Sequence, residues 1–157
     1  MRRHPRGAFI KLQGGMNKKG PIVLIDDDQD DLHLLIEIFS DFNLPNEIHL
    51  FKNVDSVVNF LRKPDIDPFL IVSDINMPVV DGFKLREMIL SDPQTNCRNV
   101  PYIFFTTSTM LKVVANGKGQ TFQGIFKKPS RHSEWKETLS SIVKYWTLSM
   151  PPDEYEL

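Results

Sequence analysis

Five polar side chains stand at the ends of short apolar segments and offer the chemistry of metal and phosphate binding. Three of them are carboxylates, one is a hydroxyl and one is an ammonium: Asp26, Asp27, Asp74, Thr106 and Lys128. Each apolar segment has the composition of a buried strand. If these strands are parallel, their carboxyl ends lie along one edge of one sheet. The sequence therefore predicts that the five side chains share a pocket.

The three carboxylates favour a hard divalent cation. Unneutralised carboxylates in one pocket repel one another, so the pKa of at least one of them should rise. Carboxylate and carbonyl oxygens suit Mg²⁺, which keeps some of its water and often shares its site with phosphate oxygens. A neighbouring ammonium and hydroxyl can offset the charge of a phosphoryl group, and a carboxylate can accept that group as an aspartyl phosphate. The set thus indicates Mg²⁺-dependent acceptance of a phosphoryl group.

Strands and helices alternate around these residues. The predicted strands are 22–25, 47–51, 69–73, 102–106 and 124–127. Apolar residues at helical spacing predict the buried faces of four helices: Leu32, Leu35, Ile36 and Phe39; Val54, Val57, Val58 and Leu61; Phe83, Leu85, Met88 and Ile89; and Trp135, Leu139, Ile142, Val143 and Trp146. This alternation, with almost wholly apolar strands, predicts an α/β fold: a doubly wound five-stranded parallel sheet with helices on both faces.

The length of 157 residues fits one domain, which we expect at residues 18–148. We interpret 1–17 as a disordered leader or a cloning remnant, and 149–157 as a C-terminal tail whose prolines prevent helix continuation. No apolar run approaches the roughly 18 residues that span a membrane, and Cys97 is the single cysteine, so we expect a cytoplasmic protein. A formal net charge of −1 argues against nucleic acid as a partner.

Four motifs resemble the receiver domain of two-component response regulators. They are Ile25-Asp26-Asp27-Asp28, Ser73-Asp74-Ile75-Asn76-Met77-Pro78 with Asp81-Gly82, Phe105-Thr106-Thr107-Ser108, and Lys128-Pro129. The resemblance covers nearly everything after Met16 and implies a flavodoxin-like sheet with strand order 2-1-3-4-5. Because it leaves no room for an output domain, the chain is similar to stand-alone, chemotaxis-type receivers of bacteria.

The resemblance implies an acceptor and a metal site. Asp74 would be the phosphoacceptor. The Mg²⁺ ion would be held by Asp27 directly, by Asp26 largely through water, by Asp74, and by the backbone carbonyl of Asn76.

The resemblance also implies how the signal is read. Thr106 would turn toward the phosphoryl group and carry the switch, and Lys128 would contact a phosphoryl oxygen. The peptide bond between Lys128 and Pro129 is expected to be cis, as X–Pro bonds allow at a modest free-energy cost. The family usually has Tyr or Phe three residues before the Lys, whereas this chain has Ile125. An aliphatic side chain offers no ring to follow the switch hydroxyl.

The resemblance implies protein partners. The phosphoryl group would come from a sensor histidine kinase or a phosphotransfer protein, and the signal would leave through a downstream protein target that the sequence does not name. The domain would phosphorylate and dephosphorylate itself and would not be a turnover enzyme. We expect a monomer or a weak dimer, with neither membrane nor nucleic acid as a partner.

Two further features have plainer interpretations. Segment 109–123 contains two glycines where the family has a helix, and each costs about 1 kcal/mol relative to Ala. We therefore predict a short helix at 110–116 followed by a mobile loop. Asp28, Asp30 and Asp31 are interpreted as helix-capping or solvated residues, with Asp28 or Asp30 capping the first helix.

Other functions fit the sequence less well. A degenerate receiver that binds partners without phosphorylation is favoured by Ile125 and by segment 109–123, but the complete acidic set opposes it. A phosphohydrolase with Asp26 as nucleophile lacks a cap domain over its substrate. A flavodoxin-like redox role conflicts with the aspartates at 26–28, which would repel a flavin phosphate.

Overall fold

The computed structural model describes residues 16–95, 97–107 and 122–150. The predictions for the leader before Met16, for the helix at 110–116 and for the tail after Met150 lie outside these residues. Among the helices that are described, none combines the length and the apolar character that crossing a lipid bilayer requires.

Five parallel strands form one sheet, as the sequence predicts. They are β1 (Ile22–Ile25), β2 (Ile48–Phe51), β3 (Leu70–Asp74), β4 (Tyr102–Thr106) and β5 (Gly124–Lys127). Their order in the sheet is β2-β1-β3-β4-β5. The three central strands β1, β3 and β4 are buried along their whole length, which explains why they read as continuous apolar runs. Strand β3 extends to Asp74, one residue beyond the predicted end, so the carboxylate belongs to the strand itself.

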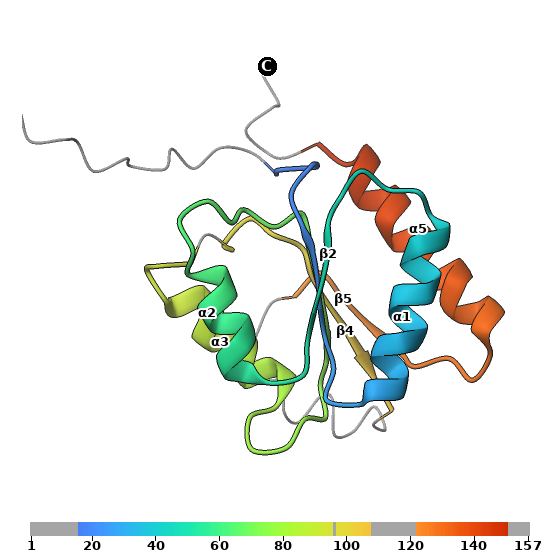
Figure 1. Cartoon of the computed structure of the whole chain (residues 1–157), viewed down its shortest axis with the longest axis horizontal. Helices are drawn as coiled ribbons and strands as arrows, with labels where there is room; N and C mark the ends of the chain where they lie inside the picture. The colour runs from blue at the N-terminus through green and yellow to red at the C-terminus, as the bar shows by residue number, and fades with distance from the viewer. Residues whose placement is uncertain (1–15, 96, 108–121, 151–157) are drawn as a thin grey trace, which may run out of the picture.

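Helices cover both faces of this sheet. They are α1 (Gln29–Asp41), α2 (Val54–Leu61), α3 (Gly82–Ser91) and α5 (His132–Leu148). Figure 1 shows the sheet nearly edge-on, with α2 and α3 on one side and α1 and α5 on the other. The side chains of β1 alternate between the two layers: Val23 and Ile25 pack on the α2/α3 side, and Ile22 and Leu24 pack on the α1/α5 side. The doubly wound architecture is therefore confirmed.

Two predicted core positions are wrong. Ile36 of α1 is 45% exposed and Met88 of α3 is 38% exposed. In α1 the buried face runs through Leu32, Leu35, Ile38 and Phe39, which places Ile36 beside this face rather than on it. The spacing of apolar residues predicts that a helix has a buried face, but it does not fix how the helix is rotated about its axis against the sheet.

Side-chain caps fix where α1 and α3 begin after their loops. Asp28 accepts hydrogen bonds from the backbone N–H groups of Asp30 and Asp31 at 2.8 and 3.4 Å, and so caps α1 as predicted. Asp81 accepts from the backbone N–H of Lys84 at 2.8 Å and caps α3. Both caps lie in the loops that follow β1 and β3, so they set the direction of the chain directly after the acidic residues.

Gly82 lets the start of α3 lie against the end of β3. Its backbone N–H donates to the carbonyl of Ile75 at 2.9 Å. A Cβ atom at this position would overlap the carbonyl oxygen of Asp74, and the Cα of Ile75 would be only 3.0 Å away. The absence of a side chain at Gly82 is thus a condition for the backbone position of Asp74.

We predict that Gly82→Ala destabilises the protein by about 1–3 kcal/mol, because the methyl group meets backbone atoms that have no free direction of movement. Urea unfolding measures this change. Gly124→Ala is the matched control, because its Cβ would meet chiefly the Phe126 ring at 3.0 Å, a side chain that can shift. Equal stability losses in the two variants would contradict the proposed role of Gly82.

Candidate functional site

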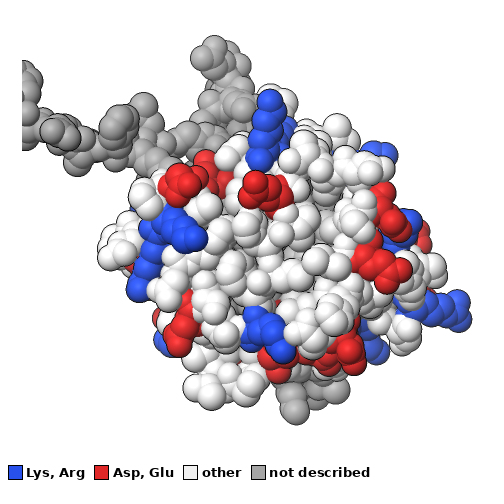
Figure 2. All heavy atoms as spheres, viewed as in Figure 1, with Lys and Arg blue, Asp and Glu red and all other residues white. Residues whose placement is uncertain are grey.

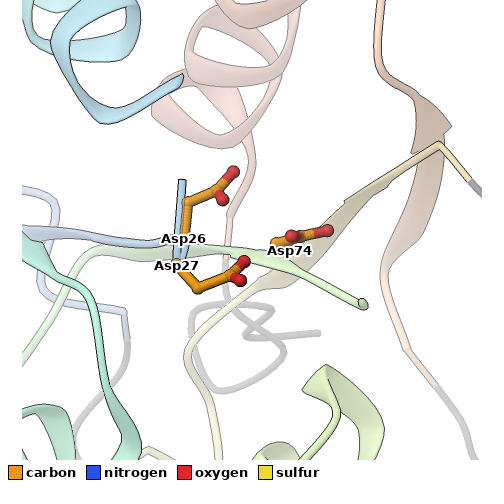
Figure 3. A group of neighbouring side chains, drawn as sticks. All are labelled: Asp26, Asp27 and Asp74. Carbon is orange, nitrogen blue, oxygen red and sulfur yellow. The ribbon is translucent and has the colours of Figure 1, made fainter. Parts of the chain in front are cut away.

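Three carboxylates meet at the carboxyl edge of the sheet. Asp26 and Asp27 follow β1, and Asp74 ends the neighbouring strand β3 (Figure 3). One oxygen from each lies within 4.8 Å of the others. Asp26 and Asp74 are buried, whereas Asp27 is exposed at the mouth of the cluster. The parallel sheet therefore brings together carboxylates that are 48 positions apart in the sequence, as predicted.

Lys128 brings a positive charge to the same place. Its Nζ lies 2.8 Å from Oδ2 of Asp26 and 3.5 Å from Oδ2 of Asp74. The backbone N–H of Lys128 donates to the carbonyl of Thr106 at 2.8 Å, which holds the end of β5 beside the end of β4. The side chain is only 9% exposed, so this is a shielded interaction rather than a surface ion pair.

Asp31 is a member of the site that the sequence did not reveal. Its Oδ2 lies 2.6 Å from Nζ of Lys128, closer than either Asp26 or Asp74. Our interpretation of Asp31 as a solvated residue of the first helical turn is therefore wrong. No local signal separates Asp31 from Asp30, because the contact arises only when the start of α1 and the end of β5 meet in the fold. The only sequence signal was its spacing: Asp31 lies four residues, or about one helical turn, after Asp27.

Thr106 and Asn76 form a second pair at the edge of the acidic cluster. The Asn76 side-chain amide lies within hydrogen-bond distance of Oγ1 of Thr106, at 3.2 Å. The backbone N–H of Asn76 donates to Oδ1 of Asp74 at 3.2 Å. Thr106 is buried at the end of β4, while Asn76 is exposed in the loop after β3. The hydroxyl predicted to act as a switch is thus connected to Asp74 through one residue.

Burial dominates the electrostatics of the acidic cluster. Burial raises the pKa of Asp74 to about 7; Lys128 opposes this rise and the charge of Asp26 adds to it. Burial also raises the pKa of Asp26, although its hydrogen bond with Lys128 acts in the opposite direction. Burial alone would lower the pKa of Lys128, but hydrogen bonds to Asp26 and Asp31 outweigh it and hold the pKa above its usual value.

The donor set fits a hard divalent cation. The three carboxylates lie close enough to share one ion, either directly or through its bound water. Carboxylates that are held together with a raised pKa gain most from a positive charge between them. Asp26, Asp27 and Asp74 are the side chains that could bind such an ion.

The two remaining site predictions concern the residues around Lys128. Ile125 is half-buried and packs with the α2/α3 layer, where its strand pairs it with Phe104. The expectation of a cis bond before Pro129 is wrong: the described residues contain no cis peptide bond. The trans form of an X–Pro bond is favoured by about 0.5–1 kcal/mol. The connection from β5 to α5 uses this trans form.

Aromatic rings support the strand ends from the other layer. Phe105, directly before Thr106, stacks on Trp135 of α5 and on Phe126 of β5, with ring centroids 4.9 and 5.5 Å apart. Trp135 is only 4% exposed. The end of β4 is thus fixed by ring contacts on the α1/α5 side.

The sequence matches one known family over most of its length. The match is to the response regulator receiver domain and covers residues 22–140. No curated protein sequence matches the chain.

Solved structures share the fold at low sequence identity. The phosphorylated cyanobacterial phytochrome response regulator RcpA has a TM-score of 0.72 and 22% identity, covering 84% of this chain and 98% of its own. The Mn²⁺-bound form of response regulator Rcp1 has a TM-score of 0.69 and 21% identity, covering 84% and 99%. The chemotaxis protein CheY4 of Vibrio cholerae has a TM-score of 0.63 and 22% identity, covering 78% and 98%. These similarities establish the fold.

We predict that the metal-free protein is destabilised by the charge on Asp74 as pH rises. The folded pKa of about 7 lies above the unfolded value of 3.8, so the stabilising proton is fully present below pH 4 and is lost as pH rises through 7. Relative to wild type, Asp74→Asn should therefore gain about 4 kcal/mol of stability between pH 4 and 8. Urea unfolding with a chelator across this range measures the gain, and a difference independent of pH would contradict it.

Proposed function

Because the chain belongs to the response regulator receiver domain family, we propose that it is a signalling receiver that accepts a phosphoryl group on Asp74 in a Mg²⁺-dependent reaction. The observation that carries this proposal is the convergence of three carboxylates and the Lys128 ammonium at one edge of the sheet. Two structurally similar proteins support it, since RcpA is described as phosphorylated and Rcp1 as Mn²⁺-bound.

Asp74 would act as the nucleophile. One of its carboxylate oxygens attacks phosphorus, the bond from phosphorus to the donor nitrogen of a phosphohistidine breaks, and the imidazole leaves with the electron pair. When bound, Mg²⁺ supplies positive charge that offsets both the carboxylates and the phosphoryl oxygens. Asp26, Asp27, Asp74 and the backbone carbonyl of Asn76 would hold it. Lys128, already 3.5 Å from Asp74, would contact a phosphoryl oxygen.

Thr106 would report the modification. Its hydroxyl lies beside the Asn76 amide in the unmodified chain and would exchange this contact for a phosphoryl oxygen. Ile125 would accompany that movement by aliphatic packing, without the ring rotation of an aromatic residue at this position. Hydrolysis of the aspartyl phosphate in the same pocket would reset the domain, so the protein would switch its own state rather than turn over a substrate.

The partners would be proteins. The phosphoryl donor would be a sensor histidine kinase or a phosphotransfer protein. A downstream protein would bind the surface of the phosphorylated domain. This chain would be a monomer or a weak dimer. On the face shown in Figure 2, acidic and basic side chains are interspersed and form no extended basic patch. On this face, the distribution supports a protein partner over nucleic acid.

Incubation with Mg²⁺ and acetyl phosphate should add the mass of one phosphoryl group to the intact protein. Asp74→Asn should abolish the gain, because an amide oxygen is a poor nucleophile toward phosphorus. Asp30→Asn, which removes an exposed carboxylate that lies outside the acidic cluster, is the matched control and should be modified like wild type. Intact-mass spectrometry under saturating donor measures the outcome. A wild-type protein that gains no mass would instead support a phosphorylation-independent binding module.

Mg²⁺ should stabilise the folded protein above pH 7. A ligand that binds only the folded state contributes about 2.7 kcal/mol at a concentration 100 times its dissociation constant. Thermal unfolding with and without Mg²⁺ measures the gain, which should fall severely in Asp27→Asn because this variant removes the exposed carboxylate of the cluster. Asp30→Asn should keep the full gain. An equal Mg²⁺ effect in all three proteins would indicate nonspecific binding to the surface.

A further inference from the structure

We propose that Asp31 is a positioning residue for phosphoryl transfer: its carboxylate holds the Lys128 ammonium beside Asp26 and off the Asp74 carboxylate. This inference rests on the proposed function, because it assigns to Asp31 a role in the reaction of Asp74. None of the four motifs that identify the receiver includes Asp31.

The contacts of Lys128 are unequal. Its Nζ lies 2.6 Å from Asp31, 2.8 Å from Asp26 and 3.5 Å from Asp74. Only the first two are hydrogen bonds. An ammonium has three N–H donors, so two of them are directed to Asp31 and Asp26, and Asp74 has the weakest contact. The acceptor carboxylate is therefore the one that the ammonium does not engage closely.

The backbone fixes both ends of the pair between Asp31 and Lys128. The Asp28 cap holds the first turn of α1 by accepting from the backbone N–H of Asp31 at 3.4 Å. At the other end, the backbone N–H of Lys128 is held by the carbonyl of Thr106. Both residues therefore project from backbone positions that hydrogen bonds hold in place.

Burial distinguishes this pair from the surface ion pairs of the same protein. The side chains of Lys128 and Asp31 are 9% and 27% exposed, whereas those of Lys84 and Glu87 are 59% and 57% exposed. A shielded pair with short contacts is screened less by salt and holds a more defined geometry than an exposed pair.

Loss of the Asp31 carboxylate would redirect the ammonium. Asp74 is the next carboxylate in reach, and a close ion pair there would occupy an oxygen that must attack phosphorus. With acetyl phosphate as donor, an Asp74 oxygen forms the new bond to phosphorus, the bond from phosphorus to the acetyl oxygen breaks, and acetate leaves with the electron pair. Lys128 forms no covalent bond in this step, so its contribution depends on where its charge is held.

The test compares Asp31→Asn with Asp31→Glu and with the matched control Asp30→Asn. Asp30 and Asp31 carry the same charge on the same turn of α1, but of these two residues it is Asp31 that pairs with Lys128. The first measurement is the NMR signal of the Lys128 side-chain ammonium in the metal-free, unmodified protein. The second is the rate of phosphorylation by acetyl phosphate at saturating Mg²⁺.

In Asp31→Asn the ammonium signal should shift or be lost through faster exchange, and the phosphorylation rate should fall about tenfold, because displacement of a reacting or stabilising group by about 1 Å can cost up to two orders of magnitude. Asp31→Glu, which restores a carboxylate, should recover most of the rate. Asp30→Asn should match wild type in both measurements.

A rate in Asp31→Asn that equals or exceeds that of Asp30→Asn would overturn the proposal, as would an unchanged Lys128 signal. If the wild-type protein accepts no phosphoryl group, the proposed function fails and the rate comparison with it. The ammonium signal still decides separately whether Asp31 places Lys128.

Discussion

The balance of charge around one ammonium is the constraint on which the site depends. Lys128 lies within 3.5 Å of three carboxylates, which come from the loop after β1, from α1 and from β3, and Asp27 adds a further negative charge to the cluster. One positive charge does not neutralise this set, and burial removes most of the screening by water. Burial is the main cause of the raised pKa of Asp74, and the negative charge of Asp26 adds to it. The features that make the pocket suitable for a cation therefore also make it costly to fold without one.

The sheet makes this concentration of charge possible. β1 and β3 are parallel neighbours, with Ile25 paired to Ser73. The next residue of each chain segment is an aspartate, so Asp26 and Asp74 lie side by side at the carboxyl edge of the sheet. β4 and β5 continue the edge, and the backbone hydrogen bond from Lys128 to Thr106 joins their ends. Gly82 completes the arrangement from outside the sheet, because α3 can begin directly against the Asp74 backbone. Asp74 lies in β3, and Asp26, Asp27 and Lys128 directly follow β1 and β5, so the sheet keeps these charges close together despite the repulsion of the carboxylates.

Much of this arrangement could be predicted from the sequence, and the exceptions share a cause. The strands were evident because buried parallel strands are continuous apolar runs, and the acidic cluster followed from the strand ends. The pairing of Asp31 with Lys128 was not evident, because it depends on how α1 approaches β5 across 97 positions of sequence. Ile36 and Met88 were misplaced because helical periodicity does not fix the rotation of a helix over the sheet. The cis bond before Pro129 was expected from resemblance alone, and no local residue pattern required it.

The contact between Phe105 and Trp135 makes the intrinsic fluorescence of the protein sensitive to the position of the end of β4. Trp135 is one of two tryptophans in the chain, and it is buried against Phe105, the residue directly before Thr106. A displacement of the Thr106 backbone moves Phe105 with it and changes the surroundings of the indole. The other indole, Trp146, is half-buried near the end of α5 and pairs with Tyr145. Replacement of Trp146 by Phe would leave a single emitting indole, so the fluorescence of the unlabelled protein could follow the state of the strand end in real time.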